Sequence, residues 1–301
     1  MTGVWRINLL PSGRSVDARR FCLENDIVGV GWPVKDLPSG ATWEEYSSRA
    51  DQLYRQRLNR KGWWPALRAL HNRMRVGNLV WTRDETGTYL LGRVEGPWSY
   101  VLDARHEAAD IVNVRKCPWT KIGAADEVPG PVTTSFRGLT LTEVKEPSAS
   151  LTKLIYNDKV GSRAYQVELG EADLFGLLSA DECEDLVALY LQVELGYCVL
   201  PSTAKPSTPA YEFVLRHRES GTKALVQVKS GSESLLVDRY HKAPADIVFL
   251  FSARGKYVNR VDESKVKCIE PEEVRHFFFE NPALIPERTR RWLEALRGVA
   301  P

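Results

Sequence analysis

The sequence predicts an α+β protein of two domains, in which a small barrel-like β domain with helical insertions precedes an α/β domain. The chain has 301 residues, enough for two domains of roughly 150 residues that each bury a core. Eight of its nine tryptophans lie within the first 119 residues, so the halves differ in composition. Short strands dominate the first half, whereas helices and strands alternate in the second.

Five runs rich in β-branched and aromatic residues predict the strands of the first domain. They span residues 4–10, 27–33, 77–83, 88–96 and 111–119, and the turn DETG joins the third and fourth as a hairpin. Two helices interrupt these strands. The first begins at a capping box of Thr42 and Glu45 and runs to Leu58, and the second runs from about Pro65 to Arg75.

A polar segment punctuated by Pro and Gly follows the first domain. It contains the stretches EVKEPSAS and NDKVGS, which are typical of a connection between domains. Residues 146–175 are therefore expected to link a domain of residues 1–145 to a domain of residues 176–301.

The second domain opens with the strongest helix signal in the chain. Ser179 and Glu182 form a capping box, and apolar residues recur at helical spacing as far as Gly196. Strands are expected at 197–201, 211–217, 223–229 and 246–252, with a tight RESG turn between the second and third. A short helix at 233–242, a strand within VKCIE and two terminal helices complete an α/β arrangement.

The composition is that of an ordinary globular protein and excludes several classes. A net charge of +2 does not by itself indicate nucleic-acid binding, and the longest apolar run, IVFLF, is too short to span a bilayer. Five cysteines without a CxxC pair argue against a disulfide framework and a zinc site, and fit a cytoplasmic protein. The motifs of serine hydrolases, nucleotide motors and dinucleotide enzymes do not occur.

A group of polar residues marks the predicted strand 223–229. Gln227 and Lys229 share one face at its end because side chains alternate along a strand, and Lys229 is either the first solvated residue or part of a site. Glu212 lies within an apolar strand, where a carboxylate is costly unless it is paired or binds a metal. Glu184 lies at the edge of the apolar stripe of the preceding helix.

The order of these groups resembles the PD-(D/E)xK nuclease superfamily, in its Mrr-like restriction endonuclease branch, where Gln replaces the second acid. ECEDLVALYLQVELGY resembles the opening helix of that branch, and ALVQVKSG resembles its Gln-x-Lys strand. The resemblance covers residues 176–252 and implies a restriction-endonuclease-like fold with Glu184, Glu212, Gln227 and Lys229 as catalytic residues. The sequence departs from the pattern in having Glu in place of the expected Asp and no preceding Pro-Asp.

This resemblance implies metal-dependent hydrolysis of phosphodiester bonds with Mg²⁺ or Mn²⁺. Glu212, the Val228 carbonyl and the Gln227 amide oxygen would supply oxygen ligands, which Mg²⁺ prefers. Lys229 would hold the attacking water and stabilise the developing charge. A degenerate fold that no longer cleaves and a coincidental strand end remain as alternatives.

A local basic stretch in the first half could contact nucleic acid. No Asp or Glu occurs between Gln52 and Trp81, whereas basic residues alternate with aromatic ones there. Such a pattern suits phosphate neutralisation and base stacking, although a solvated helix face would look the same. The basic residues are Arg55, Arg57, Arg60, Lys61, Arg68, Arg73 and Arg75.

The first domain resembles the PUA-like superfamily, particularly its EVE and YTH-related members. The resemblance spans residues 4–120 and lies in IVGVGWP, MRVGNLVWTRD and YLLGRVEG. It implies a reader that takes a modified base into an aromatic pocket, where stacking offsets part of the cost of flipping the base. Trp32, Trp43 and Trp81 are the expected pocket walls.

Together these features predict a modification-dependent DNA endonuclease of a prokaryotic restriction or phage-defence system. The expected partner is DNA with a modified base, with RNA as a second candidate and no membrane partner. The alternatives are a non-cleaving reader of modified nucleic acid and an RNA-directed nuclease toxin. The sequence leaves open whether the protein acts as a homodimer.

Overall fold

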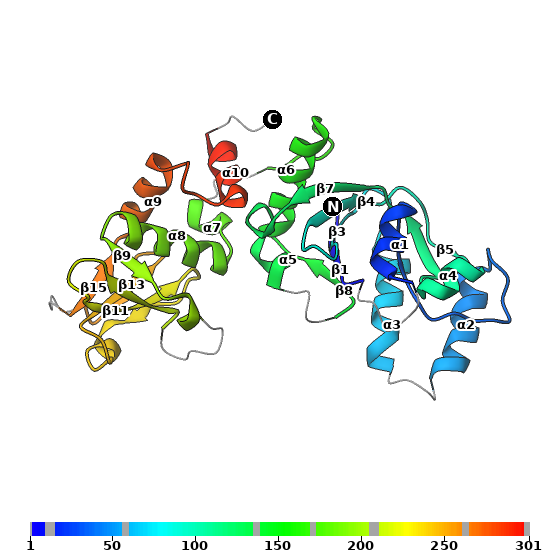
Figure 1. Ribbon diagram of the computed structural model, residues 1–301, viewed down its shortest axis with the longest axis horizontal. Coiled ribbons are helices and arrows are strands. Elements are labelled where there is room, and N and C mark those ends of the chain that lie inside the picture. The colour runs from blue at the N-terminus through cyan, green and yellow to red at the C-terminus, as the bar shows by residue number, and fades with distance from the viewer. Residues whose placement is uncertain are drawn as a thin grey trace. The chain divides into compact units, whose positions relative to one another are not determined.

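The computed structural model describes residues 2–9, 16–55, 60–134, 139–168, 173–204, 211–260 and 265–297, with only the backbone of residues 60–62. The chain divides into two compact units, Met1–Val167 and Glu168–Ala300. Both mix helices and strands, with ten α-helices and several sheets in the described ranges (Figure 1). None of the described helices has the length and apolar character that crossing a membrane requires.

A five-stranded mixed sheet organises the first unit, in the order β7-β4-β3-β1-β8. Its strands are β1 (Val4–Ile7), β3 (Leu79–Arg83), β4 (Tyr89–Arg93), β7 (Trp119–Gly123) and β8 (Leu141–Val144). Strand β1 runs parallel to β3, and the other neighbours are antiparallel. The predicted hairpin is confirmed: Asp84 accepts backbone hydrogen bonds from Thr86 and Thr88, and Gly87 adopts the positive φ of 85° that the turn needs.

A separate three-stranded sheet, β2-β6-β5, contains β2 (Ile27–Val30), β5 (Ser99–Tyr100) and β6 (Asn113–Lys116). The expected strand 111–119 is two strands in different sheets, because the chain passes from β6 to β7 at Cys117 and Pro118. Proline cannot donate a ladder hydrogen bond, which favours a break there. The described strands therefore form two open sheets, and the barrel closure expected from the sequence is not found among them.

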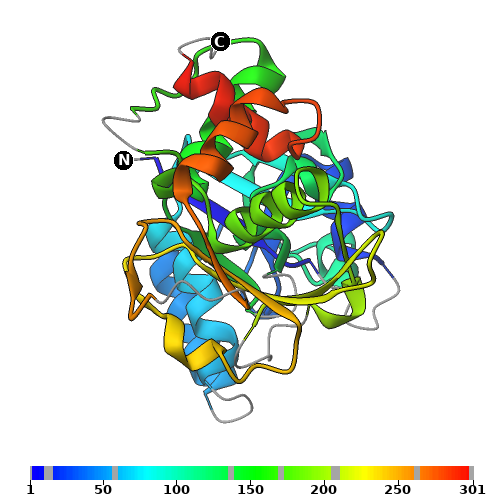
Figure 2. The same cartoon turned by 90° about the vertical axis from the view of Figure 1, so that its left-hand side faces the viewer.

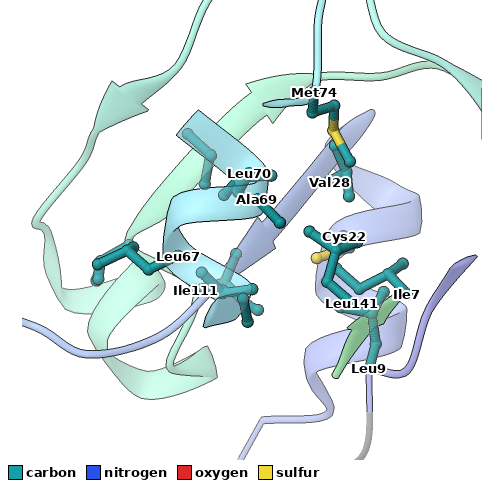
Figure 3. Close-up of a cluster of buried hydrophobic side chains, with 14 of the residues drawn as sticks. Ile7, Leu9, Cys22, Val28, Leu67, Ala69, Leu70, Met74, Ile111 and Leu141 are labelled. Atoms are coloured by element: carbon teal, nitrogen blue, oxygen red, sulfur yellow. The ribbon is translucent and has the colours of Figure 1, made fainter. Parts of the chain in front are cut away.

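Six α-helices and one π-helical turn surround these sheets. The first predicted helix begins as expected, since Thr42 and Glu45 form the capping box of α2, whereas the second begins at Arg60 and contains Pro65. Figure 3 shows Leu67, Ala69 and Leu70 on one side of the core and Cys22 of α1 on the other. These elements are α1 (Ala18–Glu24), α2 (Trp43–Tyr54), α3 (Arg60–Arg68), η1 (Ala69–Arg73), α4 (Ala104–Ala109), α5 (Gly130–Thr134) and α6 (Ser148–Val160).

Helix α6 lies within the segment that was expected to be a linker. Leu151 and Ile155 are buried, and Thr152 accepts a 3.0 Å hydrogen bond from the indole nitrogen of Trp81. Beyond the helix, the side-chain amide of Asn157 exchanges hydrogen bonds with the backbone of Tyr165. Residues 148–165 are therefore part of the first unit, because apolar burial and satisfied polar groups hold them there.

Limited proteolysis should separate the two units after α6 rather than before it. We expect a glutamate-specific protease to cleave first after Glu168, which is exposed and follows the last anchored residue, Tyr165. Glu146 is an internal control, because its side chain is 61% exposed but it directly precedes the packed helix. Mass spectrometry of the first fragments would identify the bond, and initial cleavage after Glu146 would contradict the expectation.

The second unit is built on the five-stranded sheet β15-β13-β11-β10-β9. Strands β9, β10 and β11 form an antiparallel meander, and β13 and β15 continue the sheet in parallel with β11. The predicted strands of this half are confirmed to within two residues at most ends. They are β9 (Tyr197–Val199), β10 (Phe213–His217), β11 (Lys223–Lys229), β13 (Ile247–Ser252) and β15 (Val266–Ile269).

Helices and a short extended segment cover this sheet. The capping box of Ser179 and Glu182 starts α8 as predicted, and α8 lies along one side of the sheet (Figures 1 and 2). On the other side, Val237 packs with Leu225 and Val248, so the expected helix 233–242 is a short strand and a 3₁₀ turn. The remaining elements are α7 (Leu174–Leu177), α8 (Ala180–Val193), η4 (Pro201–Thr203), β12 (Leu235–Leu236), η5 (Val237–Tyr240), β14 (Tyr257–Val258), α9 (Pro271–Glu280) and α10 (Glu287–Leu296).

Candidate functional site

Glu212 and Gln227 meet across the antiparallel pair β10 and β11. Phe213 pairs with Val226, so the same register places Glu212, the residue before β10, opposite Gln227. The amide nitrogen of Gln227 donates hydrogen bonds to the Glu212 carboxylate and, at 3.2 Å, to the Val228 carbonyl. Gln227 is only 6% exposed, so its amide holds two acceptor oxygens together inside the sheet.

Lys229 is the last residue of β11 and shares a face with Gln227, as the alternation of the strand predicts. Its side chain is 39% exposed, and its ammonium lies 3.6 Å from the Glu233 carboxylate. An exposed pair of this kind adds little to stability. Lys229 is therefore positioned by the strand and remains able to contact a ligand.

Glu184 lies in helix α8 and interacts electrostatically with the Glu212 carboxylate. Burial, followed by repulsion from the Glu212 carboxylate, raises the pKa of Glu184 from 4.5 to about 7. A carboxyl with such a pKa is half-protonated at neutral pH, a property that clusters at functional sites. The sequence-based grouping of Glu184 with Glu212 is thus consistent with the electrostatics of the structure.

The raised pKa of Glu184 gives a prediction about stability. In the unfolded chain the pKa of Glu184 has its ordinary value of 4.5. The contribution of Glu184 to the free energy of unfolding is therefore fully present below pH 4.5 and is lost as pH rises through 7. We expect Glu184→Gln to match the parent near pH 4.5 but to exceed it at pH 8 by about 1–2 kcal/mol, with solvent screening allowed for.

Urea denaturation at both pH values would measure this difference. Glu219→Gln is the matched control, because Glu219 is an exposed turn residue with a side chain 78% exposed, and it should show no such pH dependence. Equal stability of Glu184→Gln and parent at pH 8 would contradict the assigned shift.

Other charged residues of the second unit form ion pairs within that unit. Arg288 is buried, and its guanidinium lies 2.5 Å from the carboxylate of Asp185 and 3.6 Å from that of Glu182. Arg290 and Arg291 both pair with Glu287 in α10. The ion pairs of Arg288 join α10 to α8, whereas those of Arg290 and Arg291 lie within α10.

The donor set around Gln227 fits a hard cation. A Glu212 oxygen and the Val228 carbonyl oxygen converge on one point, where the Gln227 nitrogen now donates to both. Carboxylate, carbonyl and amide oxygens are the ligands that Mg²⁺ prefers, and an ion here would have to displace the Gln227 nitrogen from between the two acceptors. Within the described ranges, no three or more His, Cys, Asp and Glu side chains gather as a metal-binding group.

The basic stretch of the first unit is only partly described. Arg57 lies outside the described residues, as do the side chains of Arg60 and Lys61. Arg55 pairs with Asp51 at 2.6 Å, and Arg73 pairs with Glu143 while lying 5.0 Å from the Trp5 ring. Arg68 and Arg75 are exposed. Internal pairing thus reduces the positive charge available to a phosphate at two of these positions.

At two of the three tryptophans expected to line a base pocket, other groups of the protein take the place expected for the base. Trp81 is fully buried with its indole nitrogen bonded to Thr152, so the expectation that it walls an open pocket is wrong. Trp43 stacks on His71 with ring centroids 3.9 Å apart and planes 7° apart. That face of Trp43 has no room for a base, because the histidine ring already covers it.

Trp32 differs from Trp43 and Trp81 in its backbone conformation. Its backbone has a φ of 68°, a left-handed conformation that costs a residue of this size about 1–3 kcal/mol. Four side chains each donate a hydrogen bond to one of the backbone carbonyls of residues 31–34. The pairs are Asn113 to Gly31 at 2.7 Å, Tyr46 to Trp32 at 2.8 Å, Tyr54 to Pro33 at 2.6 Å and Tyr100 to Val34 at 2.8 Å.

These four hydrogen bonds fix residues 31–34 in a strained conformation. The donors come from α2, β5 and β6, up to 82 positions away in sequence, so local patterns gave no sign of them. Strain that persists because surrounding groups impose it is typical of ligand-binding positions.

Comparison with known proteins adds one finding. A family model described as a domain of unknown function (DUF8426) matches residues 5–145, so most of the first unit is similar to that family. Neither the curated proteins nor the solved structures contain a match to the chain.

Proposed function

We propose that the protein is a metal-dependent DNA endonuclease whose first unit selects substrates by a modified base. The observation that carries the nuclease proposal is the convergence of Glu212, Gln227 and the Val228 carbonyl beside Lys229. The acceptor oxygens could bind a cation, and the cation and the accessible ammonium of Lys229 would together neutralise the negative charge of a phosphodiester in its transition state.

The residues have distinct proposed roles. Glu212, Val228 and Gln227 would hold a Mg²⁺ or Mn²⁺ ion, which when bound neutralises charge on the phosphate and promotes ionisation of water. Lys229 orients the attacking water and stabilises the charge that develops on the phosphate oxygens. Glu184, with its pKa of about 7, can accept a proton near neutral pH.

The order of elements supports this assignment. Helix α8 is followed by the meander β9, β10 and β11, and then by β13 parallel to β11. The resemblance to Mrr-like nucleases rests on the same order of helix, acidic strand and Gln-x-Lys strand. The proposed cellular role in restriction or phage defence rests on that resemblance.

A specific observation favours a second candidate, a reader that no longer cleaves. The Gln227 amide nitrogen already donates to both acceptors that a cation would need, so these two oxygens are hydrogen-bonded within the protein as it stands. Cation binding must reorient this amide, and a protein in which this does not happen would bind nucleic acid without hydrolysing it.

A cleavage assay separates these candidates. The purified chain is incubated with matched modified and unmodified DNA and RNA, with Mg²⁺, with Mn²⁺ or with a chelator. We expect divalent-dependent cleavage of modified DNA. Binding without cleavage under all ion conditions would favour the non-cleaving reader, and cleavage of RNA alone would favour the toxin nuclease.

A further inference from the structure

The 3₁₀ turn η5 lies on the face of the sheet that carries Gln227 and Lys229. Leu225 precedes Gln227 by two positions in β11, so their side chains point to the same face. Val237, the first residue of η5, is fully buried in one hydrophobic cluster with Leu225. The turn therefore packs on the sheet beside the candidate site.

Tyr240 ends η5 and points toward the same face of the sheet. Side chains three positions apart eclipse each other in a 3₁₀ helix, so Tyr240 takes the direction of Val237, and it packs against the same cluster. Burial raises the pKa of Tyr240, Arg239 partly offsets this increase, and the Glu212 carboxylate raises the pKa further. The phenol therefore lies within electrostatic range of Glu212 and keeps its proton at neutral pH. Its hydroxyl forms no hydrogen bond with the residues that the structure describes.

Hydrogen bonds on both sides of η5 hold Tyr240 in this position. Before the turn, Leu235 of β12 pairs with β14, and its backbone N–H donates to the Lys256 carbonyl at 2.9 Å. After the turn, the Ala243 N–H donates to the Tyr240 carbonyl at 3.0 Å, and the Lys265 ammonium donates to the Ala243 carbonyl at 2.8 Å. The protein itself thus fixes the turn, so a ligand that contacts it need not order the backbone.

Tyr240 lies between Arg239 and Lys242 in sequence, and both cations are exposed. Within the part of the chain that the structure describes, no carboxylate forms an ion pair with either of them. The neighbouring Asp238 carboxylate instead accepts a 3.2 Å hydrogen bond from the Asn259 amide. The basic stretch of the first unit, by contrast, has two of its cations in internal ion pairs. Positive charge is therefore available to a ligand beside the candidate site.

We propose that Arg239, Tyr240 and Lys242 form a phosphate wall, along which one strand of the DNA substrate lies as it enters the site of Glu212 and Lys229. The Tyr240 hydroxyl donates a hydrogen bond to a phosphate oxygen next to Glu212, and the two cations contact neighbouring phosphates of the same strand. Phosphate contacts position a strand and carry no base information, so the wall accepts any sequence, modified or not. This inference deepens the nuclease proposed above and rests on it.

Charge-removing substitutions test the two cations. Fluorescence anisotropy of the full chain with a labelled unmodified duplex, in chelator and at several salt concentrations, compares Arg239→Gln and Lys242→Gln with the parent. Each variant should bind about threefold to tenfold more weakly at low salt, with a slope of log affinity against log salt smaller by about one, since one phosphate contact is lost. Lys267→Gln is the matched control, because Lys267 follows the clustered Val266 in β15 and points to the opposite face. A parental slope in both variants, or an equal change in the control, would overturn the proposal.

Tyr240→Phe tests the hydroxyl alone. The ring and its packing remain, so the variant should melt at the parent temperature. We expect its affinity for the same duplex to fall by about tenfold, because a hydrogen bond to a charged oxygen is lost, while the salt slope stays parental because no charge is removed. Tyr197→Phe is the matched control, since the Tyr197 ring lies 5.2 Å from that of Phe249 on the opposite face of the sheet. Parental affinity of Tyr240→Phe, or an equal loss in Tyr197→Phe, would overturn the role of Tyr240.

The phosphate wall and the proposed function fail in different ways. Parental affinity and parental cleavage rate in all three variants of the wall would overturn the wall and leave the endonuclease standing. Binding that depends on Arg239, Tyr240 and Lys242, without cleavage by the parent under any ion condition, would support the wall and overturn the endonuclease.

Discussion

Replacing Lys229 by Ala is expected to lower the rate of DNA cleavage by about 100-fold to 1,000-fold while changing DNA affinity by less than about twofold. The proposed lysine stabilises charge that develops only in the transition state, so its loss should affect the chemical step and not the ground-state complex. Single-turnover cleavage and anisotropy in chelator measure the two quantities separately. Stability should change little, because the ion pair with Glu233 is exposed.

The strand offers a matched control for this variant. Lys223 begins β11 on the same face as Lys229, at the opposite end, and its ammonium bonds to the Pro244 carbonyl. Lys223→Ala should therefore cleave at a rate near that of the parent. Undiminished cleavage by Lys229→Ala, or an equal loss in both variants, would refute the catalytic assignment.

Replacing Glu212 by Gln is expected to abolish binding of Mg²⁺ and Mn²⁺ at this site. Glu212 supplies the one carboxylate of the proposed donor set, and an amide in its place removes the negative charge that favours a divalent cation. Isothermal titration calorimetry with Mn²⁺ would measure the loss. Removal of the Glu212 charge should also move the pKa of Glu184 downward, because repulsion from Glu212 is its second cause after burial.

Glu219→Gln serves again as the control, since it makes the same chemical change at an exposed turn of the same unit. A Mn²⁺ isotherm for Glu212→Gln that matches the parent would show that Glu212 is not a ligand. A pKa of Glu184 that does not fall would show that the two carboxyls do not interact.

The second unit could be predicted well because its signals are local. Two-residue alternation placed Gln227 and Lys229 on one face of β11, and a capping box fixed the start of α8 at Ser179. The sequence placed Glu212 and Gln227 in two strands joined by a tight turn, and the register of that hairpin in the structure sets the two residues opposite each other. Catalysis, the bound metal and the nucleic-acid partner remain predictions.

The first unit was harder to predict because distant residues determine its features. Trp81, Trp43 and Trp32 look alike in sequence, yet the first is buried and donates a hydrogen bond to Thr152, and His71 stacks on the second. Asn113 and Tyr46 help to hold the third in its strained backbone. Helix α6 was missed because polar residues and Pro147 at its start resemble a connection, whereas burial of Leu151 and Ile155 holds it in place.

The hydrogen bond between Trp81 and Thr152 shows that the family match and the folded unit end at different residues. The family match ends at residue 145, but Trp81 of β3 depends on a partner seven residues beyond that limit. A fragment that ends at residue 145 would expose one side of the Trp81 indole to water. It would also leave the indole N–H without its protein acceptor, at a cost of about 1–3 kcal/mol for the lost acceptor alone. The family match is therefore shorter than the compact first unit, so a recombinant form of this unit should extend to Val167.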